Sequence, residues 1–237
     1  VAAGFGQNPL LRKYNLAYRY REFGELTLSV MPADWPVSAT LSAMLTDDSY
    51  TESQLGMTDS SSDHVSLDVG WSIRDDAYLF VLVGEENIEA TQFGSEFFGA
   101  ADWAAYHDDA FRHWGGGIEL RNVDDQTDIV LDYSNTEGNT DIRMQRTGVS
   151  VADYPRIHSD FESLRLKFRY RRSERLDIDL DFRYESFRTN DWALAGVDPD
   201  TLPSVLALGA DPYDYGVWVF GVSFRYLIGG REILFPE

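Results

Sequence analysis

The sequence has no cysteine, few basic residues and no long apolar run, and each absence excludes a class of protein or site. Without cysteine there is no disulfide, no thiolate metal site and no covalent attachment of haem through a C-x-x-C-H motif. No run of about 18 apolar residues occurs, which excludes a membrane-spanning helix. The 20 basic residues are outnumbered by 40 acidic ones, and the resulting net charge of −20 argues against nucleic acid as a partner.

The start of the chain also lacks a feature of secreted proteins. Residues Val1 to Phe5 contain no basic region followed by an apolar core, so no signal peptide is visible. We expect either that such a peptide was removed or that the sequence begins partway through a longer protein. The 237 residues suffice for one large β domain or two small ones.

Two stretches, 164–171 and 176–184, alternate strictly between apolar and polar residues. This period of two indicates strands whose two faces meet different surroundings. A turn at 173–175 would join them into a hairpin, and cross-strand pairs of opposite charge would then fix its register. The expected pairs are Arg171 with Asp177, Arg169 with Asp179, and Lys167 with Asp181.

Seven further stretches have apolar residues at strand spacing, which gives nine predicted strands in all. They lie near residues 23–30, 37–45, 65–72, 78–88, 114–120, 128–133 and 217–226. The stretch 78–88 is apolar on both faces, so its sequence does not assign its sides. Aromatic residues make up 14% of the chain, and this content suits the aromatic girdles of a membrane barrel.

The predicted connections alternate between short and long. The short ones lie near 33–36, 73–76, 123–127 and 172–175, and the long ones near 47–63, 89–109, 135–159 and 190–213. Short periplasmic turns that alternate with long outer loops are typical of outer-membrane barrels. A soluble β-sandwich or lipocalin-like barrel is the alternative.

We therefore predict an all-β, antiparallel transmembrane β-barrel with about nine or ten strands in this chain. Because a barrel leaves no open edge in lipid, we expect the chain to be part of a larger barrel. It is treated as a single region, 1–237. Residues 1–22 are the N-terminal segment and outer loop, 23–227 the strands, and 228–237 a C-terminal tail.

Several motifs resemble the C-terminal part of the MtrB/PioB family of decahaem-associated outer-membrane barrels. They are Lys13–Ala17, Thr46–Tyr50, Ser53–Asp59, Asn190–Val197 and Leu206–Gly209, and they follow the family order across nearly the whole chain. Members of the family are far longer, so the resemblance covers only their C-terminal portion. Family barrels usually end near an aromatic such as Tyr226, whereas this chain continues to Glu237.

The resemblance implies a wall that sheathes a periplasmic multihaem c-type cytochrome in the lumen. It also implies electron transfer across the outer membrane of a Gram-negative bacterium and a possible extracellular multihaem cytochrome at the long loops. The haem would belong to the partner, and this chain would bind no cofactor of its own. The alternative function is a porin-like channel for small solutes.

A sheath needs a polar lumen and an apolar outer face. The residues predicted to face the lumen and the partner are Arg165, Lys167, Arg169, Arg171, Asp177, Asp179, Asp181, Asp128 and Asp132, with Ser66 and Asp68 in the same role. Those predicted to face lipid or lie in the aromatic belts are Trp71, Trp114, Phe168, Phe182, Trp218, Phe220, Phe224 and Tyr226. The polar set would equally suit a water-filled pore.

Other candidate chemistry is weak. His107 and His113 lie close in sequence, but no familiar ligand spacing supports a metal site there. The aspartates of the last loop, at 198, 200, 211 and 214, could bind Ca²⁺ only weakly, since no EF-hand pattern is present. There is no G-x-S-x-G motif, and no histidine stands beside a plausible nucleophile, so we expect no catalytic site and no enzyme.

Overall fold

The computed structural model describes residues 8, 10–13, 16–96, 99–192 and 214–228, and these contain nine β-strands. In chain order the strands are β1 (Tyr20–Val30), β2 (Val37–Ser49), β3 (Gly56–Arg74), β4 (Ala77–Gly94), β5 (Trp103–Leu120), β6 (Thr127–Arg146), β7 (Ile157–Ser173), β8 (Leu176–Thr189) and β9 (Tyr215–Tyr226). No helix among the described residues has the length and apolarity that a membrane span requires.

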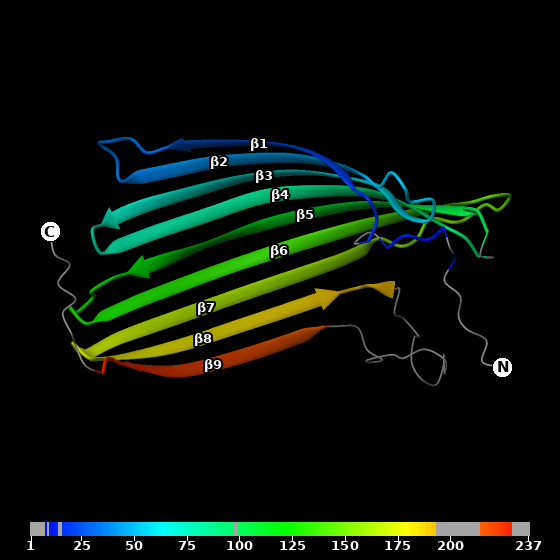
Figure 1. Cartoon of the computed structure of the whole chain (residues 1–237). Helices are drawn as coiled ribbons and strands as arrows, with labels where there is room; N and C mark the ends of the chain where they lie inside the picture. Colours follow the sequence, from blue (N-terminus) through cyan, green and yellow to red (C-terminus); the bar gives the residue numbers. More distant parts are fainter. Residues whose placement is uncertain (1–7, 9, 14–15, 97–98, 193–213, 229–237) are drawn as a thin grey trace, which may run out of the picture.

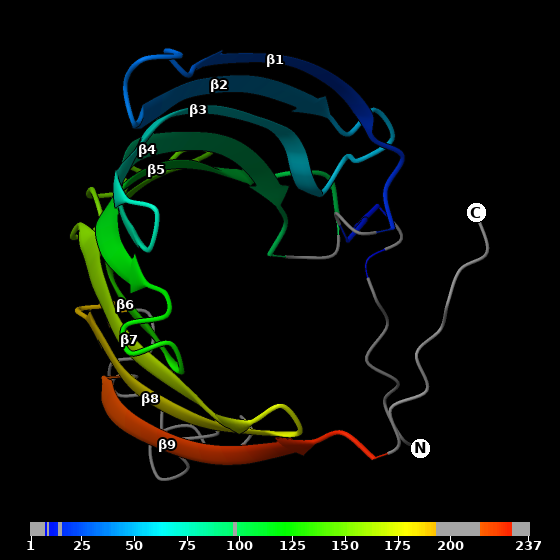
Figure 2. The ribbon, with the colours of Figure 1, turned by 90° about the vertical axis from the view of Figure 1, so that its left-hand side faces the viewer.

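All nine strands belong to one antiparallel sheet, in which each strand pairs with its neighbours in sequence (Figure 1). Seen along the strands, the sheet curves around an interior and stays open between β1 and β9 (Figure 2). A β-sandwich would bury one face against a second sheet. No large side chain of the described residues is fully buried, and no second layer covers the sheet. The sandwich alternative is therefore wrong.

One face of the sheet is apolar across all the strands. Residues directly opposite one another in neighbouring strands share a face. One such row on this face consists of Val37, Trp71, Leu79, Ile118, Leu131, Leu166, Phe182 and Phe220. Its members on β9 are among the most exposed residues, with Phe220 69% and the neighbouring Phe224 68% exposed.

The opposite face is polar and follows the concave side of the curve. One of its rows consists of Ser38, Gly70, Phe80, Gly117, Asp132, Arg165, Arg183 and Val219. Side chains converge on the inside of a curved sheet and spread apart on the outside. Asp132 and Arg165 are accordingly half-buried, whereas Leu131 and Leu166, the adjacent residues on the apolar face, are 39% and 40% exposed.

The predicted hairpin has the predicted register. Lys167 lies opposite Asp181, Arg169 opposite Asp179, and Arg171 opposite Asp177. The turn differs in detail, because an irregularity between Arg171 and Ser173 lets Ser173 pair with Leu176. The connection therefore has two residues, 174–175, instead of the three that the alternation indicated.

Three of the four predicted long loops, 47–63, 89–109 and 135–159, are wrong over most of their length, because they are strand. The connections at this end of the sheet are 50–55, 95–102, 147–156 and 190–214, and those at the other end are 31–36, 75–76, 121–126 and 174–175. The sequence misled because apolar residues do not alternate regularly with polar ones in the strand extensions. Backbone pairing with an equally long neighbour holds them in the sheet. Residues 193–213, in the last of these loops, lie outside the described residues.

The apolar band covers only part of strands such as β6 and β8. On β8 it runs from Leu176 to Tyr184, about the nine to eleven residues that a tilted membrane strand needs. On β6, the same face continues beyond Tyr133 with Asn135, Glu137, Asn139 and Asp141. The strands at the end with the larger connections thus extend well past the apolar band.

Candidate functional site on the concave face

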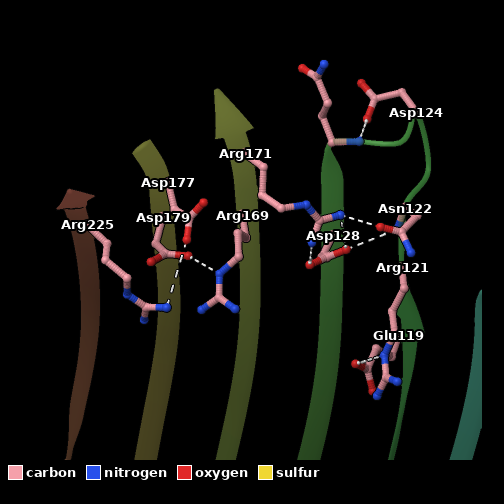
Figure 3. Close-up of polar contacts among 11 residues, drawn as sticks. Glu119, Arg121, Asn122, Asp124, Asp128, Arg169, Arg171, Asp177, Asp179 and Arg225 are labelled. Carbon is pink, nitrogen blue, oxygen red and sulfur yellow. Dashed lines mark hydrogen bonds and ion pairs between the residues drawn. The ribbon is translucent and has the colours of Figure 1, made fainter. Parts of the chain in front are cut away.

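The nine charged residues predicted to face the lumen all lie on the concave face. Each either belongs to the polar row described above or lies an even number of residues from a member of that row on the same strand, which puts it on the same face. They are Asp128 and Asp132 on β6, Arg165, Lys167, Arg169 and Arg171 on β7, and Asp177, Asp179 and Asp181 on β8. Figure 3 shows these strands side by side, with charged side chains that point toward one another across them.

Three of the four β7 cations are bound to carboxylates of the wall. Arg169 Nε donates to Asp179 Oδ1 at 2.6 Å, and Arg165 donates to Asp181 Oδ2 at 3.0 Å from Nε and 2.8 Å from Nη2. Arg171 reaches back to Asp128 on β6, with 2.8 Å between Nη1 and Oδ2. These side chains therefore lie along the sheet and do not project from it.

Two of the three expected charge pairs have different partners in the structure. Arg171 faces Asp177 in the register but forms its ion pair with Asp128, and Arg165 holds the Asp181 carboxylate that Lys167 faces. The long guanidinium stem allows a diagonal contact, and its planar fork donates two hydrogen bonds to one carboxylate. Register alone therefore did not identify the partners.

These exchanges leave two of the nine predicted charges without an ion pair. Lys167 and Asp132 form no ion pair among the described residues, although Arg165 lies directly opposite Asp132. Asp177 is held only loosely, by Arg225 at 3.9 Å. Lys167 is also more exposed than its paired neighbour Arg165. It is the cation on β7 best placed to meet a charge from outside the wall.

On β4 and β5 the same face carries aromatic side chains that lie over glycines of the next strand. Phe80 lies opposite Gly117, and a Cβ at Gly117 would come within 2.7 Å of the Phe80 ring. His113 covers Gly84 in the same way, where a Cβ would come within 2.3 Å of the imidazole. An aromatic ring laid over a cross-strand glycine covers exposed backbone and pins the register.

On β1 to β3 the concave face is small and hydroxylated. Its residues include Thr27, Ser29, Thr40, Ser42 and Ser66, and the hydroxyls of Ser29 and Thr40 are 3.1 Å apart. Asp68 interrupts this set. The concave face thus has three sectors: a hydroxyl sector on β1 to β3, an aromatic–glycine sector on β4 and β5, and a charged sector on β6 to β9.

All eight residues predicted to face lipid lie on the convex face, where aromatic side chains cluster at the edge of the apolar band. The ring centroids of Trp114 and Tyr133 are 5.2 Å apart, and those of Tyr184 and Trp218 are 4.3 Å apart. The full set is Trp71, Trp114, Phe168, Phe182, Trp218, Phe220, Phe224 and Tyr226. Tyr133 and Tyr184 belong to the same belt and were missing from the prediction.

His107 and His113 do not approach each other. They are six residues apart on the straight strand β5, which places them roughly 20 Å apart. His113 stacks instead on His64 of β3, with ring centroids 5.5 Å apart. Within the described ranges no three histidine, cysteine or acidic side chains are grouped to hold a metal ion. Of the loop aspartates only Asp214 is described, and it accepts a hydrogen bond from the Thr189 amide.

Beyond the apolar band, a bidentate ion pair fastens the 147–156 connection to β6. Arg156 donates to Asp141 at 2.9 Å from Nε and 2.5 Å from Nη2. The hydrogen bonds from Arg156 hold the pKa of Asp141 below its ordinary value of 3.8. A carboxylate with a lowered pKa stabilises the fold above its unfolded pKa, and this contribution is lost as the pH falls through the folded value.

We therefore expect acidification below pH 3.8 to loosen the 147–156 connection first. Hydrogen exchange of its amides, followed by mass spectrometry at decreasing pH, measures this. In Asp141→Asn the same amides should exchange faster at neutral pH and change less on acidification. Equal pH profiles for the two proteins would show that the ion pair does not hold the connection.

The fold and faces agree with what the chain is similar to. Residues 2–228 match the family described as outer membrane beta-barrel porin, MtrB/PioB. The chain belongs to the MtrB/PioB family. It is 27% identical to outer membrane protein MtrB of Shewanella baltica (strain OS185) over 224 residues. This aligned region covers 93% of this chain and 31% of that protein. The chain thus spans about a third of the length of this MtrB/PioB relative.

Two solved structures have a similar fold. The copper transporter OprC superposes with a TM-score of 0.66 at 10% identity, over 90% of this chain and 35% of OprC. BauA, the ferric preacinetobactin receptor of Acinetobacter baumannii, gives 0.62 at 9% identity, over 87% of this chain and 37% of the receptor. At these identities the likeness shows the fold alone. This MtrB/PioB chain is therefore a β-barrel wall of the outer membrane of a Gram-negative bacterium.

Proposed function

We propose that this chain forms part of a barrel that sheathes a multihaem c-type cytochrome and positions it for electron transfer across the outer membrane. Similarity to MtrB along nearly the whole chain motivates the proposal. In this proposal the convex aromatic face meets lipid and the concave face meets the partner. The haem belongs to the partner, since this chain has no cysteine to attach it. The wall itself does no catalysis.

The observation that carries the proposal is that the long side chains of the concave face lie flat along the sheet. Arg165, Arg169 and Arg171 lie along the wall in ion pairs, and Phe80 lies across Gly117. Because these side chains do not project into the lumen, its full width is available to a folded protein. A solute-selective channel instead uses rings of charged side chains or constrictions that reach into the pore. A porin-like channel stays the second candidate, because the same polar face also suits water and the family is described as porin.

A partner on the outside of the cell is a further part of the proposal. The extensions of β4, β5 and β6 past the apolar band would support an extracellular multihaem cytochrome at their connections, 95–102 and 147–156. This part of the proposal is supported by the pairing of these strands up to their ends, which would hold the two connections in fixed positions.

The test uses the full-length protein expressed with its own periplasmic cytochrome. A haem Soret band that co-purifies with the assembled barrel supports the sheath, because this chain cannot attach haem covalently. Electron transfer into liposomes that hold the purified complex should depend on both proteins. Solute flux through the barrel alone, with no retained haem, would favour the channel.

Lys167 should contribute to retention of the partner. Reversal of its charge in Lys167→Glu should leave barrel assembly unchanged, since the residue has no ion pair in the wall, and should weaken retention roughly three- to tenfold in low salt. The measure is haem absorbance per barrel after washes of increasing ionic strength. Arg169→Ala should weaken retention as well, because it frees Asp179 on the same face. Equal retention by wild type and Lys167→Glu would show that the partner does not touch this part of β7.

A further inference from the structure

The aromatic–glycine sector is apolar although it lies on the concave face. Tyr78, Phe80 and Leu82 of β4 share this face with Gly115 and Gly117 of β5, and Val130 continues the patch on β6. Leu82 lies between Val81 and Val83, which belong to the apolar band of the convex face. At this height β4 is therefore apolar on both sides, which is why its sequence alone could not be assigned a face.

This patch has no partner within the wall beyond its neighbours in the sheet. Tyr78 is 37% exposed, and Phe80 and Leu82 are partly exposed, with no second layer above them in the described part of the chain. Lipid cannot reach the inside of a closed barrel, so the patch faces either water or another protein. Apolar surface in water costs about 25 cal/mol per Å² relative to burial. A water-filled pore gains nothing from an apolar patch here.

The glycines make the patch flat. A Cβ at Gly117 would come within 2.5 Å of the Leu131 carbonyl oxygen and within 2.7 Å of Phe80, so no side chain fits beneath the ring. A Cβ at Gly115 would come within 2.6 Å of the Tyr133 carbonyl oxygen. With glycine at both positions, the Phe80 ring lies down against β5. A folded protein can then approach the ring and the strand at van der Waals distance together.

The charges around the patch define the surface that would complement it. The concave face carries no charged side chain between Tyr78 and Leu82 on β4 or between Gly115 and Gly117 on β5, but two carboxylates border the patch. Glu119 lies opposite Tyr78 and Val130 and is paired with Arg121, and Asp132 lies opposite Gly117. Directly beside the patch, Val130 is paired with Lys167, which has no ion pair among the described residues. The complementary surface is thus apolar at its centre, with charged groups of both signs along the edge that meets β6 and β7.

We propose that Tyr78, Phe80, Leu82 and Val130 form the docking patch for an apolar area, bordered by charged groups of both signs, on the surface of the protein enclosed in the lumen. This rests on the proposed function, because the occupant is the sheathed cytochrome. The patch fixes which side of the occupant faces β4 and β5. Lys167 and the rest of the charged sector fix its rotation and height, since charges at an interface edge contribute more to orientation than to affinity.

Photo-crosslinking tests the contact without changing charge. The full-length barrel, expressed with its cytochrome, would carry p-benzoylphenylalanine in place of Phe80 or, as a control on the convex face, Val81. Irradiation should join the barrel to a haem-staining partner from position 80 and not from position 81. No haem-stained adduct from position 80, in a complex that retains haem, would overturn the docking patch. Adducts with a second barrel copy or with the chain itself would also overturn it.

A matched pair of substitutions tests the energetic role. Phe80→Asp places a charge in the patch, and Ser42→Asp places the same charge on the concave face of β2, in the hydroxyl sector. Retained haem per assembled barrel should fall about tenfold for Phe80→Asp, as for loss of an interface anchor, and less than about twofold for Ser42→Asp. Equal losses for the two variants would overturn the proposal.

The outcomes separate this inference from the proposed function. If wild type retains haem but Phe80→Asp retains as much, the docking patch is wrong and the sheath stands. If wild type retains no haem under any condition, the sheath itself fails and the patch falls with it. If Phe80→Asp does not assemble, the crosslinking result at position 80, which preserves an aromatic ring, decides.

Discussion

Phe220→Arg is expected to prevent assembly of the full-length barrel in the outer membrane. Phe220 is 69% exposed on the convex face and lies opposite Phe182, inside the apolar band. A cation at such a position costs about 2–4 kcal/mol near the bilayer midplane, and less toward the interfaces. Because no carboxylate among the described residues lies near Phe220 on that face, none of them offsets the cost. Assembly is measured by outer-membrane fractionation and by the heat-dependent shift of the folded barrel on a gel.

The adjacent residue provides the control. Val219 is 40% exposed and belongs to the concave face, where it lies opposite Arg183. Val219→Arg should assemble nearly as wild type does, since water or a protein surface surrounds the new charge. Assembly of Phe220→Arg at the level of Val219→Arg would mean that the convex face does not meet lipid. The proposed function would then lose its basis.

Gly117→Val should have the second large effect, this time through packing. The added side chain would collide with the Leu131 carbonyl oxygen, 2.5 Å from the ideal Cβ position, and with the Phe80 ring. Because one of the two obstacles is backbone, β5 and β6 must separate locally or Phe80 must leave its place. Overpacking of this kind costs about 1–3 kcal/mol. Denaturant titration of the purified barrel, followed by tryptophan fluorescence, measures the change.

Gly221→Val is the matched control on the same face. A Cβ at Gly221 meets only Asp181, at an ordinary contact distance of 3.8 Å. Its unfolding midpoint should stay near that of wild type, and valine suits a strand better than glycine. If Gly117→Val were as stable as Gly221→Val, the flat packing of Phe80 on β5 would not matter for the fold.

Strand pairing and the two faces of a strand could be predicted from the sequence where one face is apolar and the other is polar or charged. The alternation in 164–184 predicted the register of β7 with β8, and the structure agrees in all three of the expected facing pairs. A similar alternation in 217–226 assigned Trp218 and Phe220 to the face that the structure shows to be convex. A period of two is a strong signal because a slip by one residue would bring every charge among the apolar side chains.

Strand length could not be read in the same way. Residues 135–146 of β6 are polar except for Ile142 and Met144, too few to show a strand period, and this mainly polar composition favoured loop. What decides is the backbone ladder with the extension of β5, a contact between residues about 30 apart in sequence. The covering of glycines by Phe80 and His113 was hidden for a similar reason, because it appears only once two strands are in register.

The height of β4 to β6 has a consequence for where the barrel opens. A strand of 20 residues, as in β6, is about 65 Å long, or roughly 50 Å high at the tilt of a barrel, whereas the hydrocarbon core is about 30 Å thick. The surplus stands as a stiff polar collar above the lipid. If the barrel encloses a multihaem cytochrome as proposed, the collar would cover the haems beyond the lipid, and the outermost haem would lie where large or insoluble redox partners can reach it.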